Sequence, residues 1–489
     1  MLAGVAWVLG FRVFDRIAGI LSIMVLARLL VPTHFGLVAL ATSVAAFVEL
    51  LAALSLDAVL IQKKDAVKDD YDTAWTIQVA IAALCALLLL LMAPLAAEFF
   101  RQPGLKGLIF VLAGAMLVDG FTNIRIVEFR KMMRFDREFM FMASRRLLTT
   151  AVTITSAFLL RNEWALVIGI ASGKVFGVLL SYAMRPYVPR FTLASRNELL
   201  QASSWLFLGN AVQFVRMRLS DFVLGRAAGP TVVGAFNLAN ELSSIVSTEL
   251  VAPINRVALP EFSSIGNVAG VVQRFNQLTG QIAIFLMPMG IGLMACAHPL
   301  VEVFFGRSWG MAAEVLGILA CSGLVAGLGS NIGVAFLALG KFRQNTMLQA
   351  TGAAILVPLL TFGAAAYSYV GAAFAMLAAN AILVVVAVLT MRHYIGYRFR
   401  DFLHCLWRPA ISAAVMYLAV RPIVQHREWF AGESVVLQLA AAVMAGAIVY
   451  LLTLLAIWVL RGRRDIPEQI TLRMVGMVLN KVSARFRRS

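Results

Sequence analysis

Three charged residues lie in the middle of the first long apolar stretch of the chain: Arg12, Asp15 and Arg16. Their spacings of three and four residues place them on one face of a helix, and Gly19 continues the stripe. A charge at the centre of a lipid-facing helix costs about 2.5–3.5 kcal/mol on an insertion scale. The stripe therefore predicts either a water-filled cavity facing this helix, or an Arg–Asp pair enclosed in protein with the second Arg reaching toward the membrane surface.

A second polar stripe lies in the apolar stretch near 202–226. Gln213 and Arg216 share one helix face, whereas Arg218 and Asp221 share another and are placed to form an ion pair. Residues two apart point about 200° away from each other, so Arg216 and Arg218 cannot both face one cavity. Lys174 is a further cation inside an apolar stretch, and we expect it to stand isolated.

The chemistry of these cations favours an anionic ligand. Guanidinium groups offer a planar fork of donors that matches phosphate, so a phosphate or pyrophosphate head group is the predicted ligand. The candidate substrate-binding residues are Arg12, Arg16, Lys174 and Arg216.

Acidic residues also lie within the apolar stretches. Each is a candidate to carry a coupling proton or sodium ion, and each is equally a candidate structural partner of a nearby Arg. These residues are Asp15, Glu49, Asp57, Asp119, Asp221, Glu241 and Glu249.

The cysteines and histidines predict neither a metal site nor a catalytic centre. The four cysteines are scattered without a CxxC pair, and the five histidines show no HExxH spacing. We therefore expect no metal, no cofactor beyond a coupling proton or sodium ion, and no catalytic residues.

The composition places these residues in a membrane protein. Hydrophobic residues make up 61% of the 489-residue chain, charged residues only 14%, and the mean hydropathy is +0.86. A soluble protein of this size would have too few polar groups to cover its surface. The net charge of +17 is explained by basic loops near anionic membrane lipids rather than by nucleic-acid binding.

Apolar stretches of about twenty residues predict an all-α protein with about fourteen transmembrane helices. The predicted spans are 3–30, 35–62, 73–99, 106–124, 140–160, 164–184, 202–226, 231–254, 280–304, 311–339, 346–368, 371–391, 407–424 and 435–460. Connectors after the even-numbered spans are rich in Lys and Arg, so both termini are expected in the cytoplasm. Two termini on one side require an even number of spans, which agrees with fourteen.

The chain also contains an internal repeat. Residues 28–41 (RLLVPTHFGLVALA) and 226–239 (RAAGPTVVGAFNLA) share six identities at a constant offset of 198. The alternative is a chance similarity of two apolar segments. A true repeat predicts two parallel six-helix units related by an axis along the membrane normal. The expected domains are 1–198 and 199–396 as six-helix lobes, 397–460 as two added spans, and 461–489 as a basic cytoplasmic tail forming an interfacial helix.

Several segments, taken in order, resemble the bacterial oligosaccharide (polysaccharide) flippases of the multidrug/oligosaccharidyl-lipid/polysaccharide exporter superfamily. They are ARLLVPTHFGLVALA (27–41), LSLDAVLIQKKD (54–65), EWALVIG (163–169), RPYVPRFTLASRNELLQASSW (185–205), SDFVLGRAAGPTVVGAFNLA (220–239) and VALPEFSSI (257–265). The resemblance covers the first 270 residues well and the rest mainly by the number of spans.

The resemblance implies two lobes that form a V and open alternately to each side of the bacterial cytoplasmic (inner) membrane. It implies a polyprenyl-pyrophosphate-linked oligosaccharide as substrate, moved to the outer leaflet for exopolysaccharide, O-antigen or capsule synthesis. It also implies ion-driven antiport. The expected protein is a monomer that works beside a polysaccharide polymerase and co-polymerase.

Three alternatives remain open. A cation-coupled multidrug exporter of the same superfamily would usually have twelve spans and prefer cationic substrates. A membrane polysaccharide polymerase or ligase would need a sizeable external loop, and no external connector is long enough. A flippase for a lipid-linked peptidoglycan precursor would differ in substrate alone.

Overall fold

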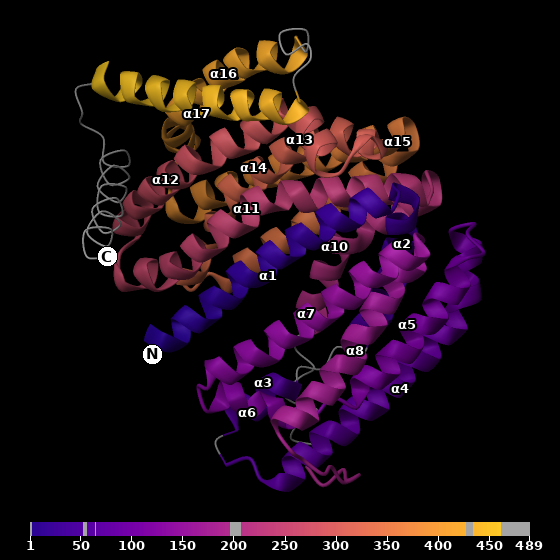
Figure 1. Ribbon diagram of the computed structural model, residues 1–489. Helices are drawn as coiled ribbons and strands as arrows, with labels where there is room; N and C mark the ends of the chain where they lie inside the picture. The colour runs from indigo at the N-terminus through magenta and orange to yellow at the C-terminus, as the bar shows by residue number, and fades with distance from the viewer. Residues whose placement is uncertain (1, 52–55, 64, 196–206, 427–433, 461–489) are drawn as a thin grey trace, which may run out of the picture. The chain divides into compact units, whose positions relative to one another are not determined.

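The structure, a computed structural model, describes residues 2–51, 56–63, 65–195, 207–426 and 434–460, and this part of the chain is built from helices without strands (Figure 1). It divides into two compact units, Met1–Ala235 and Phe236–Ser489. The predicted all-α class is confirmed. The predicted tail 461–489 and the predicted lobe boundary at 198 lie outside the described residues.

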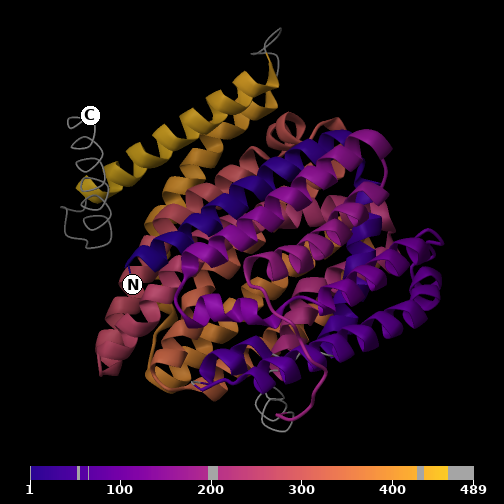
Figure 2. The same ribbon diagram turned by 60° about the horizontal axis from the view of Figure 1, so that its bottom comes forward.

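The described residues of unit 1 form ten helical elements and the beginning of an eleventh. They are α1 (Leu2–Leu29), α2 (Pro32–Leu51), α3 (Leu56–Gln62), α4 (Lys68–Phe99), α5 (Leu105–Gly120), η1 (Ile124–Ile126), α6 (Val127–Lys131), α7 (Phe135–Leu160), α8 (Trp164–Met184), α10 (Phe207–Ala227) and α11 (Pro230–Ser264). Helix α1 packs along α7, and α7, α8, α5 and α4 follow one another as neighbours (Figures 1 and 2).

Small residues allow these helices to approach closely. Helix α8 buries Gly169, Gly173, Gly177 and Ser181, which recur every four residues and therefore form one face. A Cβ atom at Gly169 would lie 1.9 Å from the hydroxyl oxygen of Thr153 on α7. Such small-residue faces are typical of helices packed in membranes, where close van der Waals contact replaces the hydrophobic effect.

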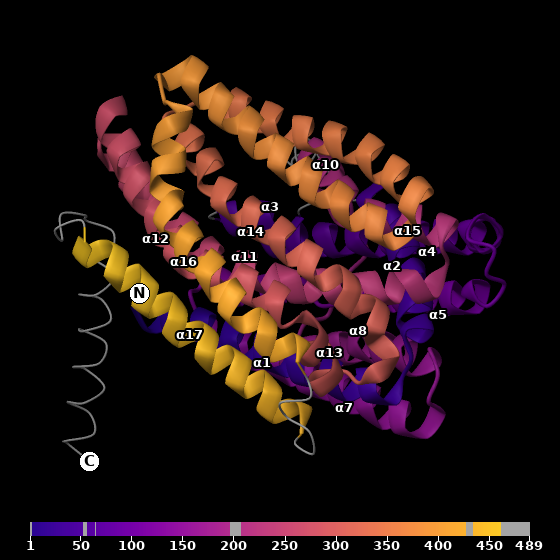
Figure 3. The same cartoon turned by 90° about the horizontal axis from the view of Figure 1, so that it is seen from above.

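In unit 2 the structure describes the rest of α11 and seven further elements. They are α12 (Val268–Ala295), α13 (Ala297–Phe304), η3 (Arg307–Trp309), α14 (Gly310–Ala338), α15 (Phe342–Ile395), α16 (Phe399–Gln425) and α17 (Val435–Leu460). Helix α15 is broken at Tyr367 and Ser368, whose backbone angles are not helical, so it forms two arms (Figure 3). This break lies where the sequence predicts the turn between two spans.

The two added spans predicted within 397–460 correspond to α16 and α17, which lie side by side (Figure 3). Their apolar side chains share a core with α12 and α14. The buried Tyr450 hydroxyl on α17 donates a hydrogen bond of 2.8 Å to the Ile284 carbonyl on α12. These two helices are therefore part of the core of unit 2.

Eight of the described helices are long and apolar enough to cross a membrane, or nine if one bent pair forms a single span. The chain is therefore a multi-pass membrane protein. Helix α1 has 28 residues but contains Arg12, Asp15 and Arg16, which reduce its hydropathy. The count of fourteen stays a prediction.

The two copies of the sequence repeat meet within unit 1, where α2 and α11 begin. The Thr33 and Thr231 hydroxyl oxygens are 2.7 Å apart. A Cβ atom at Gly36 would lie 1.7 Å from the Pro230 carbonyl oxygen, and one at Gly234 would lie 2.0 Å from the Pro32 carbonyl oxygen. Only glycine allows backbones to approach this closely.

Candidate functional site

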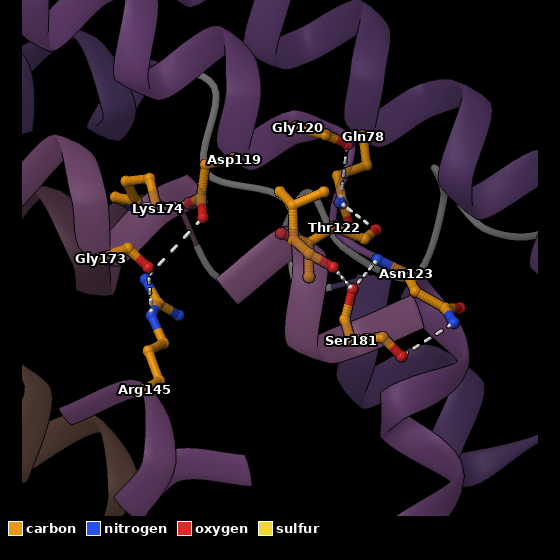
Figure 4. Close-up of polar contacts among 10 residues, drawn as sticks. Gln78, Asp119, Gly120, Thr122, Asn123, Arg145, Gly173, Lys174 and Ser181 are labelled. Atoms are coloured by element: carbon orange, nitrogen blue, oxygen red, sulfur yellow. Dashed lines mark hydrogen bonds and ion pairs between the residues drawn. The ribbon is translucent and has the colours of Figure 1, made fainter. Parts of the chain in front are cut away.

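A broken helix forms one wall of the candidate site. Helix α5 ends at Gly120, and the chain resumes as η1 and α6 after a bend of 65°. The break frees backbone carbonyls, and the Gln78 amide on α4 donates to two of them, at 2.9 Å to Gly120 and 3.1 Å to Thr122 (Figure 4). A break inside a membrane helix is tolerated where side chains satisfy the freed groups.

Asn123 secures the other side of the break. Its backbone N–H donates to the Ser181 hydroxyl at 3.1 Å, and its amide nitrogen donates to the Arg185 carbonyl at 2.6 Å. Its amide oxygen accepts from the Arg125 N–H at 3.0 Å. The bend is therefore held by α4 and by the end of α8, through the side chains of Gln78, Asn123 and Ser181 and through backbone groups.

Asp119, one residue before the end of α5, lies between two cations. Its carboxylate is 2.6 Å from the Lys174 ammonium on α8 and 3.9 Å from the Arg145 guanidinium on α7. The Arg145 Nε also donates to the Gly173 carbonyl at 2.9 Å (Figure 4). The expectation that Lys174 stands isolated was wrong, because its partner is 55 residues away and can be identified only in the folded chain.

The next residue of α7 continues the ion pairs toward α1. The Arg146 guanidinium is 3.3 Å from the Asp15 carboxylate. Charges therefore run from α1 through α7 to α5 and α8. We call this set the charged row; its members are Asp15, Arg146, Arg145, Asp119 and Lys174.

Glycines make room for both arginines of the row. A Cβ atom at Gly177 of α8 would lie 3.2 Å from the Arg145 guanidinium carbon, and one at Gly19 of α1 would lie 3.0 Å from an Arg146 nitrogen. Gly19, which belongs to the stripe that the sequence predicts on α1, therefore leaves space for the Arg146 side chain.

Two members of the charged row line a cavity within unit 1 that has a volume of about 690 Å³. Asp119 and Arg145 line it, together with Glu49 of α2, Asp57 of α3 and Arg130 of α6. Volumes of about 300–1,000 Å³ are typical of small-molecule sites. Two of the acids predicted to carry a coupling ion thus share a cavity wall with the row.

The remaining predicted residues lie in other places. Arg12 is exposed on α1, and Arg16 is half-buried. Arg216 is half-buried on α10 and is not among the cavity-lining residues in the described part of the chain. The predicted ion pair between Arg218 and Asp221 is present at 3.5 Å.

Asp221 has a second partner, because the Ser43 hydroxyl of α2 donates to its carboxylate at 2.5 Å. The carboxylate therefore joins α10 to α2. Glu249 belongs to α11, but its side chain lies outside the described residues.

Arg145 and Arg146 are the site residues that the sequence reasoning missed. The signal was available: two adjacent arginines interrupt an apolar helix in the segment MASRRLLTT. The prediction of the span 140–160 depends on its mean hydropathy, which does not single out these two residues. The charged row itself has three cations (Arg145, Arg146 and Lys174) and two carboxylates (Asp15 and Asp119), so its net charge is +1.

A basic connector follows α8 and is attached to the start of α4. The Tyr187 hydroxyl donates a short hydrogen bond to the buried Asp72, and the Arg190 N–H donates to the same carboxylate oxygen at 3.3 Å. Burial, followed by the hydrogen bond to Asp72, raises the pKa of Tyr187 above its ordinary value. The hydroxyl therefore keeps its proton and remains a donor.

Comparison with known proteins agrees with this architecture. A family described as "Polysaccharide biosynthesis protein" matches residues 25–314, which is more than half of the chain. The lipopolysaccharide biosynthesis protein WzxC of Escherichia coli (strain K12) is 24% identical over 80% of this chain and 81% of its own length. The succinoglycan biosynthesis transport protein ExoT of Rhizobium meliloti (strain 1021) is 26% identical over 89% and 88%, respectively.

Among solved structures, the lipid II flippase MurJ in its inward closed conformation has the same fold. It aligns with a TM-score of 0.75 over 93% of this chain and 99% of its own, at 14% identity.

Proposed function

The chain belongs to the polysaccharide biosynthesis protein family, and from this premise we propose that it moves lipid-linked oligosaccharide across a bacterial membrane. The proposal rests on a cavity of about 690 Å³ inside a multi-pass helical protein, whose wall includes Arg130, Arg145 and the carboxylate of the Asp119–Lys174 ion pair. Relatives named for lipopolysaccharide biosynthesis and succinoglycan transport align along four fifths or more of the chain. The chain acts as a transporter and not as an enzyme.

The proposed substrate carries a pyrophosphate between its polyprenyl chain and its sugars. Guanidinium groups bind phosphate oxygens in pairs, which suits the cations of the site. We propose that Arg12, Arg16, Lys174 and Arg216 hold the pyrophosphate, joined by Arg145 and Arg146. The sugars would lie in the wet cavity, and the polyprenyl chain would remain in the lipid.

The proposed architecture has fourteen spans, with lobes 1–198 and 199–396 as parallel repeats and α16 and α17 added. The contact between Thr33 and Thr231 supports the repeat, because residues at equivalent positions touch only near an axis that relates them. The lobes would open alternately to each side of the cytoplasmic membrane, with both termini in the cytoplasm. The transporter would act as a monomer beside the polymerase and co-polymerase.

The proposed driving force is a proton or sodium gradient, used in antiport. Asp57 and Glu49 line the cavity and are reachable by either ion. Asp15 forms an ion pair with Arg146, and Asp221 forms one with Arg218. We therefore assign these two acids a structural role ahead of a role in ion coupling. Glu249 remains a candidate on sequence grounds.

Deletion of the gene in the source bacterium tests the proposal. Lipid-linked oligosaccharide should accumulate on the cytoplasmic face, where added membrane-impermeant glycosidase cannot reach it in intact spheroplasts. Expression of the intact chain should restore external exposure of the glycan. Unchanged export in the deletion strain, together with new sensitivity to cationic drugs, would instead identify a multidrug exporter.

A further inference from the structure

We propose that Asp119 is an internal counter-ion that occupies Lys174 and Arg145 in the empty transporter and yields them to the anionic head group of the substrate. The inference rests on the proposed function and goes beyond it by assigning a residue that sets how tightly the substrate is held. It follows from the position of one carboxylate between two cations, at the wall of a cavity.

The Asp119 side chain is accessible from the cavity. The Asp119 side chain is 31% exposed, and the residue lines the cavity together with Arg145. The structural acids of unit 1 differ: Asp221 and Asp72, each 2% exposed, are enclosed by their partners. A ligand in the cavity can therefore reach Asp119 and Arg145, with Lys174 directly behind the Asp119 carboxylate, whereas it cannot reach the enclosed pairs.

The carboxylate of Asp119 is not needed to hold the helix break beside it. The carbonyls of Gly120 and Thr122 accept from Gln78, and Asn123 is held by Ser181 and Arg185. The carboxylate accepts a hydrogen bond from Lys174 and lies 3.9 Å from the Arg145 guanidinium. Its contacts can therefore change while the backbone stays in place.

The Asp119 carboxylate also lowers the net positive charge at Lys174 and Arg145. Lys174 and Arg145 together with Asp119 carry a net charge of +1, and without the carboxylate they would carry +2. A transporter must bind its substrate well enough to load it and weakly enough to release it. A carboxylate that competes with the head group weakens the bound state and returns to the cations when the substrate leaves.

The test compares purified full-length variants in lipid nanodiscs, with a short-chain polyprenyl pyrophosphate as the probe. The Asp119→Asn variant keeps the side-chain shape and removes the charge, so it should bind the probe about tenfold more tightly. In cells the same variant should export glycan several-fold more slowly, because release is delayed. A merely structural role would lower affinity and export together.

Two further variants make the expectation specific. Asp119→Asn combined with Lys174→Gln also removes a cation that holds the head group, so it should bind the probe more weakly than Asp119→Asn alone. Asp136→Asn is the matched control, because Asp136 lies at the start of α7 beside Arg134 and outside the row. It should leave both binding and export unchanged.

Equal or weaker probe binding by Asp119→Asn, in a protein that melts like the wild type, overturns the proposal. Failure of both Asp119→Asn and Asp119→Ser to insert would also overturn it, because the carboxylate would then be a structural requirement. Wild-type protein that binds no polyprenyl pyrophosphate would refute the proposed function itself. Wild-type binding with no change in Asp119→Asn would refute the counter-ion alone.

Discussion

The hydroxyl oxygens of Thr33 and Thr231 lie 2.7 Å apart, although the residues are separated by 198 positions in the chain. This separation equals the offset of the sequence repeat, so each threonine contacts its own counterpart. The neighbouring glycines make equivalent contacts, because Gly36 faces the Pro230 carbonyl and Gly234 faces the Pro32 carbonyl. The contact joins the two repeat segments, 28–41 and 226–239, at equivalent positions within unit 1.

The first prediction concerns this contact. Gly36→Ala would place a Cβ atom 1.7 Å from a backbone oxygen, which cannot be relieved by a side-chain rotation. We expect the variant to lose about 1–3 kcal/mol of stability through overpacking, visible as a lower melting temperature in detergent. Gly114→Ala in α5 is the control, because a Cβ atom there meets nothing within 4 Å. Equal melting of both variants would show that the contact is not close in the protein.

The second prediction concerns the charged stripe on α1. The double variant Arg12→Ala, Arg16→Ala should insert normally but abolish polysaccharide export, because it removes two of the cations proposed to hold the pyrophosphate. Export is measured as surface glycan, and insertion as the amount of protein in washed membranes. The exposed pair Arg134→Ala, Arg137→Ala at the start of α7 is the control. Normal export from the α1 variant would remove the stripe from the substrate site.

A third prediction tests the helix break. Gln78→Leu leaves the Gly120 and Thr122 carbonyls without their donor, and an unsatisfied buried group costs about 1–3 kcal/mol. We expect a clear drop in melting temperature. Gln62→Leu, at an exposed position of α3, should cause no such drop. If the two variants melt alike, Gln78 does not stabilise the bend.

The fourth prediction is a pH dependence at Tyr187. Its folded-state pKa is raised above the unfolded value of about 10, so the neutral hydroxyl is favoured in the folded protein. The stabilisation is full below about pH 10 and is lost as pH rises toward the folded-state pKa. Wild-type protein should therefore lose more stability between about pH 9 and 11 than Tyr187→Phe, measured by thermal unfolding. Identical pH profiles would contradict the assignment.

Hydropathy and local spacing predicted the features that depend on neighbouring residues in the chain. The helical class, the turn inside α15 and the pair of Arg218 with Asp221 are of this kind, because each is decided within a few residues. The repeat identified Thr33 and Thr231 as equivalent positions, although nothing in the sequence indicated that they touch.

The partners in the charged row could not be predicted in the same way. Lys174 and Asp119 are 55 residues apart, and Arg146 and Asp15 are more than 100 residues apart. Which acid faces which cation depends on how α1, α5, α7 and α8 are rotated against one another. That rotation is set by the small-residue face of α8 and by Gly19, whose role becomes visible only when the helices are placed together.

Each arginine of the row packs against a glycine on another helix. The residue type at each glycine position therefore limits the residue type at its arginine position. A larger residue at Gly177 would push on Arg145, and one at Gly19 would push on Arg146. Related proteins that carry a bulkier side chain at either glycine should therefore carry a shorter side chain at the matching arginine. Redesign of the site for another substrate would have to exchange each glycine and its arginine as a pair.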